Sequence, residues 1–328
     1  MALLGKIGAR ELPRIGLGCM GMSEFYGASD DQESLRLLQR AREAGYVHFD
    51  TADMYGMGHN EQLLGKFLAQ APRDSVFIAS KFGIVRDEAG GLSRSLNGRP
   101  EYVKQACEKS LARLGIEHLD LYYVHRRDTS VPIEETVGAM AELVKAGKVR
   151  SLGLSEVSAD TLRRAHRVHP IAATQTEYSL LSRAPEDELF PVCRELGVAF
   201  VAYSPLSRGL LGELSEQDLR APGDVRQFLP RFAGDNFARN RKLLGELDRL
   251  AQAKQVKVSQ LALAWVLARG SFLHIIPGTR RERYLLENFA AGGLELSTEE
   301  VARVAAAVDP ALVAGTRYPA GAMQGIGG

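Results

Sequence analysis

Apolar, β-branched runs alternate with amphipathic stretches along almost the whole chain, and this alternation limits the folds that it can adopt. Eight runs are expected to be strands: 14–18, 46–50, 75–80, 119–125, 149–155, 172–178, 198–204 and 272–278. Helices are expected to follow the strands, with candidates at 30–45, 60–69, 100–114, 132–146 and 159–166. A strand and a helix repeated eight times are typical of an α/β fold of the (β/α)8 TIM barrel type. No low-complexity linker interrupts the pattern, so we expect residues 1–328 to form a single barrel domain.

Capping residues mark several of these helices. Ser29 is the expected N-cap of the first helix, and Gly45 stands where a C′ glycine ends one. Pro100 and Pro132 suit a first helical turn, because proline lacks the amide hydrogen that this turn leaves unpaired.

Four segments depart from the alternation. The opening residues GKIGARELPR, with Gly5 and Gly8 among short apolar pieces, predict an N-terminal β-hairpin that plugs the amino end of the barrel. Residues 82–99, 204–236 and 309–328 are expected to be long loops on the carboxyl-terminal face or near it. Loops of this length in a compact domain are usually lids or binding loops.

The charge balance excludes several classes of partner. Of the 328 residues, 41 are Lys or Arg and 40 are Asp or Glu, so the formal net charge is +1. We therefore expect no binding to nucleic acid or to an acidic membrane. The N-terminus has only a short apolar stretch before Gly5 and Lys6, which favours a cytoplasmic protein. Whether the chain forms a homo-oligomer is left open by the sequence.

The cysteines do not indicate a disulfide or a metal site. Cys19, Cys107 and Cys193 are an odd number without a CxxC motif, so we expect three buried thiols. No residue cluster has metal-ligand spacing, so no metal is expected.

Four polar residues stand just past predicted strands. Asp50 and Tyr55 follow or end the run YVHFD, Lys81 follows VFIAS, and His125 follows LDLYYV. Active sites of barrels form where the carboxyl ends of the strands meet, so the four side chains are expected to converge there. His48 lies within its strand and is expected to be structural.

These residue types suit the reduction of a carbonyl group by a nicotinamide. Tyr55 is the expected general acid; since a free tyrosine titrates near pH ~10, Lys81 would be needed to stabilise its phenolate. Asp50 would hold Lys81 protonated, and His125 would orient the carbonyl group. Taken singly, Tyr55 could be a rim aromatic, Lys81 a surface or Schiff-base lysine, and His125 a structural histidine.

The content and order of six segments resemble the signature of the aldo-keto reductases: GLGCMGMSEFYG, FDTADMYGMGHNEQLLGKFL, YYVHRRD, GLSEVS, AYSPLSRGLLG and IPGTR…LLEN. The segments around HRRDTSVPIEETVGAM are most similar to the branch that contains perakine reductase, and the β subunits of potassium channels are more distant relatives. The resemblance implies a barrel that reduces aldehydes or ketones with NADPH. It assigns the catalytic roles to Asp50, Tyr55, Lys81 and His125.

The resemblance also implies how the nicotinamide is held. No strand is followed by GxGxxG, so the phosphate turn of a Rossmann fold is missing. Tyr203 would stack on the nicotinamide, and Ser155 and Gln175 would hold its carboxamide. Glu156 stands where many relatives carry Asn, so that this contact could come from the serine alone.

The adenosine end of the cofactor would lie beside the last strand. Gly278 and Thr279 precede a helix N-terminus, and Arg280 would contact the 2′-phosphate, which favours NADPH over NADH. Arg281 and Arg283 are competitors for this phosphate. The complete set of expected cofactor contacts is Gly18, Cys19, Met20, Ser155, Gln175, Tyr203, Ser204, Leu206, Arg208, Gly209, Gly278, Thr279, Arg280, Glu287 and Asn288.

The resemblance implies a small carbonyl compound as the substrate, whose identity the sequence leaves open. Besides Tyr55 and His125, the expected lining is Met22, Phe25, Tyr26, Met54, Phe82, Arg126 and Arg127. Aromatic and thioether groups suit an aldehyde with an apolar body. Arg127 could meet an acidic group on it or pair with Asp128.

Three rival classes stay open at this point. An NADP(H)-binding regulatory subunit would bind the cofactor with little turnover, and a lyase would use Lys81 as a nucleophile. A short-chain dehydrogenase would need a YxxxK helix and a Rossmann fingerprint, and neither is visible.

Overall fold

The computed structural model describes residues 3–86, 94–322 and 326–327. Its centre is an eight-stranded sheet in the order β12-β11-β10-β9-β8-β5-β4-β3, with parallel pairing throughout. Its strands are β3 (Leu17–Gly18), β4 (His48–Asp50), β5 (Phe77–Phe82), β8 (Leu121–Val124), β9 (Leu152–Ser155), β10 (Ile171–Glu177), β11 (Ala199–Tyr203) and β12 (Leu273–Ile275). Each predicted strand therefore corresponds to a strand of the sheet, although most are shorter than expected.

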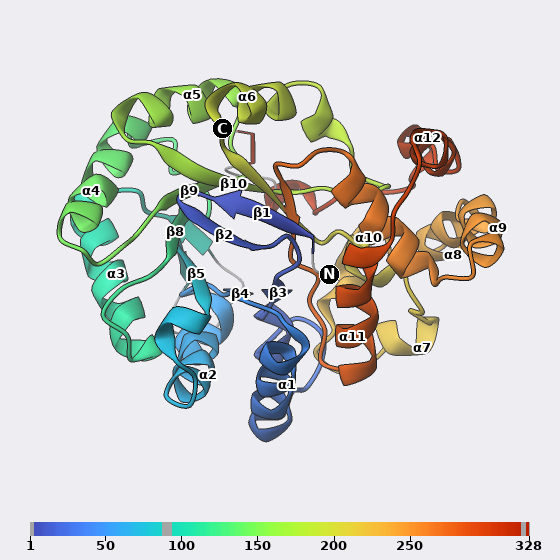
Figure 1. The fold of residues 1–328 in the computed structure, drawn as a ribbon, viewed down its shortest axis with the longest axis horizontal. Helices are drawn as coiled ribbons and strands as arrows, with labels where there is room; N and C mark the ends of the chain where they lie inside the picture. The colour runs from blue at the N-terminus through green and yellow to red at the C-terminus, as the bar shows by residue number, and fades with distance from the viewer. Residues whose placement is uncertain (1–2, 87–93, 323–325, 328) are drawn as a thin grey trace.

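The two edges of this sheet meet and close it into a barrel. Ile15, just before β3, forms a parallel bridge with Ile275 of β12. The amide of Gly16 donates to the carbonyl oxygen of Ile275 at 2.8 Å, and the Ile275 amide donates to that of Arg14 at 2.8 Å. The predicted (β/α)8 TIM barrel is thus confirmed, and Figure 1 shows the helices as a ring around the strands.

The helices are α1 (Asp31–Ala44), α2 (His59–Leu68), α3 (Pro100–Leu114), α4 (Ile133–Lys145), α5 (Ala159–Val168), α6 (Leu189–Leu196), α7 (Glu216–Leu219), α8 (Asn236–Lys242), α9 (Gly245–Ala253), α10 (Val258–Ala268), α11 (Glu282–Ala290) and α12 (Thr298–Ala306). The five delimited predictions match α1 to α5 within two residues. The predicted cap at Ser29 is wrong, because the side chain of Asp30 accepts the Glu33 amide at 2.8 Å. Gly45 ends α1 in the left-handed conformation, as predicted.

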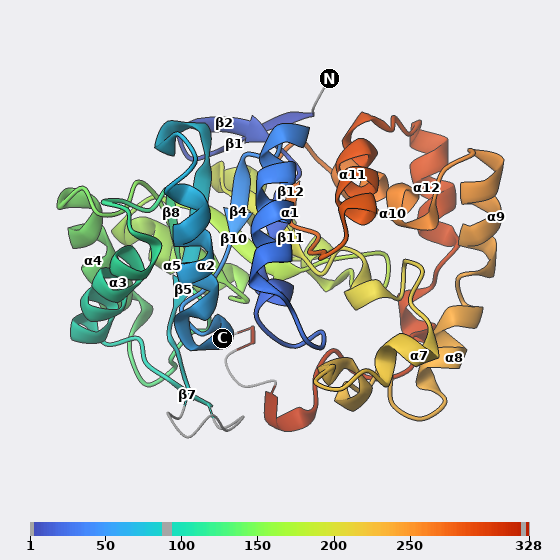
Figure 2. The same ribbon diagram turned by 90° about the horizontal axis from the view of Figure 1, so that it is seen from below.

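A hairpin plugs the amino end of the barrel. Strands β1 (Leu4–Ile7) and β2 (Arg10–Pro13) pair antiparallel. Ile7 and Leu12 bury their side chains in the cluster that fills the barrel interior. Figure 2 shows this hairpin at one end and α7, β7 and the C-terminal segment at the other. The hairpin and the long segments therefore cover opposite ends of the barrel.

Alternation along the strands decides which side chains enter the barrel. Tyr123 of β8 belongs to the interior cluster, whereas Tyr122 belongs to the shell between the sheet and the helices. A Cβ atom on Gly153 would lie 2.4 Å from the Tyr123 ring, so a glycine is required opposite it. Continuing the same register places Lys81, His125 and Ser155 at the inner rim of the carboxyl end.

The long segments at the carboxyl-terminal face of the barrel contain more helix and strand than expected. Part of 82–99 is an antiparallel hairpin of β6 (Ile84–Arg86) and β7 (Arg94–Leu96), while residues 87–93 of this predicted loop lie outside the described residues. The segment 204–236 contains α7 and folds back, so that the Val225 amide donates to the Phe25 carbonyl oxygen at 2.9 Å. The tail carries a short 3-10 helix, Pro310–Leu312, and its Arg317 reaches Glu156 after β9 and Tyr203 at the end of β11.

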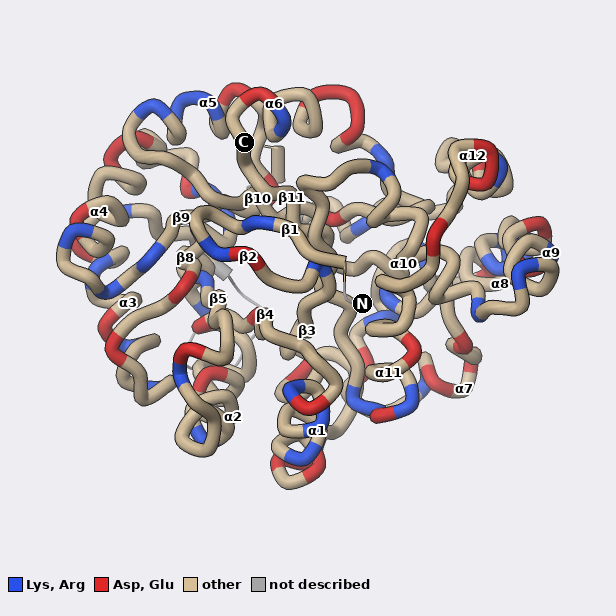
Figure 3. The backbone as a smooth tube through the Cα atoms, in the orientation of Figure 1, with Lys and Arg blue, Asp and Glu red and all other residues tan. Residues whose placement is uncertain are grey.

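Surface charge is mixed, as expected from the composition. In Figure 3, Lys and Arg alternate with Asp and Glu around the helix ring. The three cysteines are free and buried, as predicted. Within the described residues, no helix has the length and apolar character needed to cross a membrane.

Candidate active site

Three strands and one short helix bring the four predicted catalytic side chains together. Asp50 ends β4, Lys81 lies in β5 and His125 follows β8. Tyr55 begins a 3-10 turn, Tyr55–Gly58, between β4 and α2. The Tyr55 and His125 rings meet edge to face with centroids 5.7 Å apart, so the four groups share one site at the carboxyl rim.

The ammonium group of Lys81 is surrounded by three oxygen acceptors. It donates to the Asp50 carboxylate, to the Thr51 carbonyl oxygen at 2.8 Å, and to the Tyr55 hydroxyl at 3.4 Å. An ammonium has three hydrogens, so each finds an acceptor. The Tyr55 oxygen accepts here, which leaves its own hydrogen available to a substrate.

Asp50 is held on both carboxylate oxygens. One accepts from Lys81, and the other accepts from the Gln175 amide at 2.8 Å. The side chains of Asp50 and Lys81 are nearly inaccessible to solvent. A buried ion pair is tolerated when the remaining oxygen is hydrogen-bonded, as it is here. Gln175, expected at the nicotinamide carboxamide, thus has an amide hydrogen committed to Asp50.

Burial and charge act in opposite directions on the proton of Tyr55. Burial raises the pKa of Tyr55 to about 12, although the positive charge of Lys81 opposes the rise. The expected stabilisation by Lys81 is therefore present but smaller than the effect of burial. Burial also lowers the pKa of Lys81, but Asp50 and Tyr55 outweigh it and raise this pKa overall. Both groups carry their protons at neutral pH.

Unusual backbone conformations concentrate at this rim. Within the described part of the chain, the non-glycine residues with positive φ are Phe25, Met57, Glu156, Ser204, Ser207, Arg208 and Gln255. All except Gln255 lie in segments that follow barrel strands. Conformations of this kind cost about 1–3 kcal/mol each and tend to collect at functional sites.

The expected cofactor residues of the first and last strands lie side by side. A Cβ atom on Gly18 would lie 2.8 Å from the Ile276 carbonyl oxygen, and one on Gly278 would lie 2.9 Å from that of Gly18. The two backbones can approach only because both residues are glycine. Cys19 is buried, and its thiol donates to the Leu17 carbonyl oxygen at 3.5 Å; Met20 is half-buried beside it.

Arg280 is exposed and has only neutral partners among the described residues. Its guanidinium donates to the carbonyl oxygens of Tyr26, Gly27 and Ala28. Thr279 precedes it and is half-buried. Because no carboxylate neutralises its charge, such an arginine can bind a phosphate.

The two other expected adenosine contacts lie on α11. Glu287 accepts from Arg283 at 2.8 Å, while Asn288 is buried. Arg283 also donates to Glu213 at 3.0 Å, so this competitor for the phosphate is already paired.

The expected pyrophosphate loop follows β11. Ser204 and Arg208 adopt left-handed conformations, with Leu206 half-buried between them, and Gly209 continues the turn. The Arg208 guanidinium donates to Glu177 at 3.0 Å, which makes it a paired cation. Tyr203, the expected stacking residue, is half-buried at the rim.

Sequence reasoning missed an ion cluster beneath this loop, which we call the Glu156–Glu177 cluster: Glu156, Glu177, Arg208, Arg231 and Arg317. Arg317 pairs with Glu156, with a second contact at 3.2 Å, and lies 3.3 Å from Glu177. Arg231 lies 3.3 Å from Glu177. The inward register of β10 could have indicated Glu177, but no local signal indicated Arg317.

The cluster ties the tail to the carboxyl ends of β9, β10 and β11. Arg317 donates to the Tyr203 hydroxyl at 2.9 Å, and the Tyr318 hydroxyl lies 3.1 Å from it. Glu156 is therefore a tail anchor, in addition to standing next to Ser155.

The structure separates the expected substrate residues into two groups. Met54 packs with Tyr55 and Phe25 in a small apolar cluster at the rim. Tyr26 is half-buried against Arg226 of the returning loop. Arg126 donates to the Ser155 hydroxyl at 3.2 Å. These residues face the mouth.

The second group does not. Phe82 stacks on Tyr122 in the shell behind the sheet, because it occupies the outward register of β5. Met22 is buried in the same shell. Arg127 donates to Thr161 of α5 at 3.0 Å. The expectation that Phe82 and Met22 line the substrate site is corrected accordingly, whereas that for Arg127 stays a prediction.

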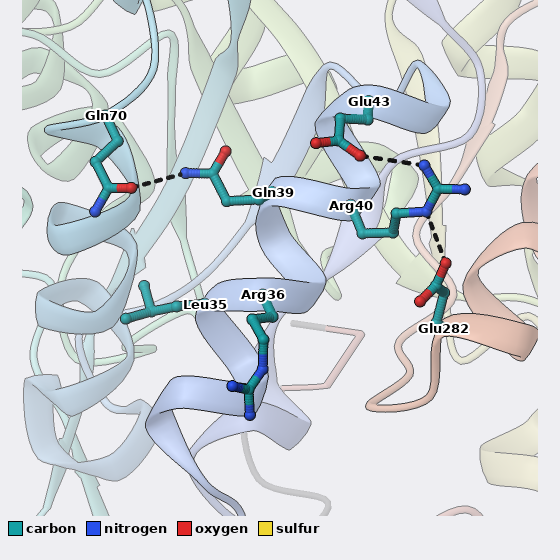
Figure 4. A pocket seen from close by; sticks show the side chains of 7 residues that line it. All are labelled: Leu35, Arg36, Gln39, Arg40, Glu43, Gln70 and Glu282. Atoms are coloured by element: carbon teal, nitrogen blue, oxygen red, sulfur yellow. Dashed lines mark hydrogen bonds and ion pairs between the residues drawn. The ribbon is translucent and has the colours of Figure 1, made fainter.

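A surface hollow outside the helix ring is a different feature. Figure 4 shows it between α1, α2 and α11, lined by Leu35, Arg36, Gln39, Arg40, Glu43, Gln70 and Glu282. Arg40 pairs with Glu43 at 3.1 Å and with Glu282 at 2.7 Å, so its charge is compensated. None of the four catalytic candidates lines this hollow. Among the described residues, no group of three or more His, Cys, Asp or Glu side chains could hold a metal ion.

Known proteins are similar in sequence to this chain over nearly its full length. Residues 14–309 match the model of the aldo/keto reductase family. A probable aldo-keto reductase 1 of Glycine max is 44% identical over 309 residues, which cover 94% of this chain and 89% of that protein. The aldo-keto reductase yakc [NADP(+)] of Schizosaccharomyces pombe is 43% identical over 323 residues, 97% of this chain and 94% of that protein.

Solved structures agree with the sequence match. The glycerol dehydrogenase of Gluconobacter oxydans superposes with a TM-score of 0.84 at 28% identity, covering 93% of this chain and 94% of that one. An aldo-keto reductase of Klebsiella pneumoniae in complex with NADPH gives a TM-score of 0.71 at 28% identity over 93% of this chain and 94% of that one. With the barrel and the family match together, the chain belongs to the aldo/keto reductase family.

Proposed function

We propose that this protein reduces aldehydes or ketones to alcohols with NADPH as the hydride donor. The observation that carries the proposal is the Lys81 ammonium with its three acceptors. This arrangement leaves the Tyr55 hydroxyl hydrogen as the one directed to a carbonyl oxygen. The NADP(H) named for two relatives supports the choice of cofactor.

Each of the four side chains has its own role in the proposed reaction. Bound NADPH supplies a hydride for the carbonyl carbon. Tyr55 donates its proton to the carbonyl oxygen as that oxygen becomes an alkoxide, and Lys81 stabilises the phenolate left behind. Asp50 keeps Lys81 charged and in position. His125, edge to face with Tyr55, orients the carbonyl group.

The residues present fit a phosphorylated dinucleotide. Arg280 is a cation without a carboxylate partner in the described chain, beside the N-terminus of α11, where an anion is favoured. Tyr203 offers a half-buried aromatic ring at the end of β11, the strand next to β12. The Gly18 and Gly278 backbones lie close together and carry no side chain.

Replacing one hydroxyl tests the proposal. Tyr55→Phe is expected to lower kcat for a small aldehyde by about 10²-fold or more. Its Kd for NADPH should stay within about twofold of the native value, because Tyr55 lies on the substrate side. The measurements are NADPH oxidation by absorbance and NADPH binding by fluorescence.

Tyr102→Phe removes a hydroxyl from α3, outside the barrel mouth, and serves as the control. Full turnover by Tyr55→Phe would refute the acid role. Tight NADPH binding by the native protein without oxidation by any aldehyde would instead favour a regulatory, cofactor-binding subunit.

A further inference from the structure

The guanidinium of Arg126 lies at the barrel mouth beside the proposed catalytic groups. Arg126 follows His125, and its Nη1 donates to the Ser155 hydroxyl at 3.2 Å and to the His125 carbonyl oxygen at 2.8 Å. Ser155 occupies the inner rim at the end of β9. The positive charge is therefore held over the carboxyl end of the barrel.

Every partner of this guanidinium within the described chain is uncharged. Besides Ser155 and the His125 carbonyl oxygen, the phenol of Tyr203 contacts it. No carboxylate of the described residues lies within ion-pair distance of Arg126, whereas Arg208, Arg231 and Arg317 of the Glu156–Glu177 cluster are all paired.

The carboxylates of the cluster next to Arg126 are paired with other arginines, although the charge of Glu156 helps to raise the pKa of Arg126. Three guanidinium groups there face two carboxylates, Glu156 and Glu177, so the cluster is already positive. Arg126 therefore adds a further guanidinium, without an ion-pair partner of its own among the described residues, to a cluster that already holds more guanidinium groups than carboxylates.

The same charge reaches the proposed acid. Burial raises the pKa of Tyr55 to about 12, and Lys81 and then Arg126 act against that rise. Arg126 directly follows His125, whose ring meets that of Tyr55 edge to face with centroids 5.7 Å apart, so the guanidinium and the proposed acid belong to the same part of the rim.

We propose that Arg126 selects the substrate by binding the carboxylate of an aldehyde that carries an acidic group. This inference rests on the proposed function, since it places the aldehyde carbon at Tyr55 and the carboxylate at Arg126. A planar guanidinium matches a carboxylate with two parallel hydrogen bonds, which a neutral substituent cannot form. Acidic aldehydes are accordingly favoured over neutral aldehydes of the same shape.

Two isosteric substrates test this selection. 4-Carboxybenzaldehyde and 4-nitrobenzaldehyde have planar substituents of similar size, but only the first is an anion. For the native enzyme, kcat/KM is expected to be higher for the carboxylate. Arg126→Gln should lower the ratio of the two kcat/KM values by about 10- to 100-fold, since it removes a charge-assisted pair but keeps a polar side chain.

Arg150→Gln is the matched control, because it removes the same charge from an exposed residue at the opposite end of β9. Its ratio should equal that of the native enzyme. An unchanged ratio in Arg126→Gln would overturn the proposal. So would a loss of NADPH affinity in this variant with the ratio preserved, which would assign Arg126 to the cofactor.

Benzoate binding separates this proposal from the proposed function. Calorimetry on the NADP⁺-loaded protein requires no turnover, and Arg126→Gln should weaken benzoate binding by about tenfold or more. Another outcome is that the native protein binds benzoate more tightly than Arg126→Gln and yet reduces neither aldehyde. In that case the proposed function fails and the anion site stands. Equal benzoate binding by both proteins would refute the anion site.

Discussion

Lys81 shows how a buried side chain can be limited to one chemical role. Its ammonium hydrogens point to Asp50, Thr51 and Tyr55, and those neighbours raise its pKa overall in spite of burial. A Schiff base requires a neutral amine with a free lone pair. The geometry therefore disfavours the lyase alternative that the sequence left open.

This reading predicts that an aldehyde and sodium cyanoborohydride will not modify Lys81. Peptide mass spectrometry after such treatment should find alkylated surface lysines, of which Lys66, with 58% of its side chain exposed, is the internal control. Alkylation of Lys81 at a rate similar to that of Lys66 would show a neutral amine there.

Arg280 is the residue expected to distinguish the two nicotinamide cofactors. Arg280→Ala should weaken NADPH binding by about 1.5–3 kcal/mol, the usual size of a charged hydrogen bond, and should change NADH binding little. Titration of both cofactors by fluorescence measures the two Kd values. Arg283→Ala is the control, because Arg283 is already paired with Glu287 and Glu213. Equal weakening of NADPH and NADH in Arg280→Ala would contradict the 2′-phosphate assignment.

At the scale of elements, the C-terminal tail is attached to the barrel by a few strong contacts. Arg317 reaches Glu156 and Glu177, and Tyr318 stacks near Arg208, with the guanidinium carbon 4.5 Å from the ring centroid. Little of the tail is otherwise buried. Its attachment to the carboxyl ends of β9, β10 and β11 therefore depends on the Glu156–Glu177 cluster.

Glu156→Gln should loosen this tail. Arg317 keeps Glu177, so the expected loss is about 1–3 kcal/mol in the local closing equilibrium, or roughly 5- to 150-fold more of the open form. Trypsin should then cut after Arg317 correspondingly faster, as measured by mass spectrometry over time. Glu134→Gln, which breaks the Arg164 pair on α4 and α5, should leave that rate unchanged. An unaltered rate in Glu156→Gln would show that the cluster does not hold the tail.

How well a helix could be predicted from the sequence depended on whether it has a polar face. α1 to α5 carry apolar residues on one face and were delimited from the sequence. α10 is buried from Leu261 to Leu267, so it has no polar face, and its bounds could not be read from periodicity.

At the scale of the whole molecule, two histidines make the barrel sensitive to acid. Burial lowers the pKa of His48 and of His274 to about 3, and both are neutral in the folded barrel. The unfolded chain binds protons at these residues below pH ~6.5, whereas the folded chain does so only near pH ~3. The contribution of the two neutral histidines to the free energy of unfolding is therefore fully present above pH ~6.5. It is lost as the pH falls from ~6.5 towards ~3.

Each histidine should lower the free energy of unfolding by about 1.4 kcal/mol per pH unit in this window. Thermal unfolding between pH 7.5 and 5 measures the effect. The double variant His48→Gln/His274→Gln should have a flatter dependence of Tm on pH than the native protein, whatever its Tm at pH 7.5. Identical slopes would show that other groups cause the acid loss.

The sequence by itself determined the local features of this protein. Continuous apolar runs indicated eight strands, and Asp50, Tyr55, Lys81 and His125 were visible as polar residues at the ends of these runs or just past them. The family resemblance rested on the same continuous segments.

Only the tertiary structure decided which distant residues meet. Gln175 reaches Asp50 across 125 positions, and Arg317 reaches Glu156 across 161. These contacts depend on closure of the sheet between Ile15 and Ile275 and on the path of the tail to the carboxyl ends of β9 and β11. The inward or outward register that separates Lys81 from Phe82 likewise depends on how the strands pair. No local pattern encodes such contacts, because their energy comes from groups that become neighbours only when the barrel is complete.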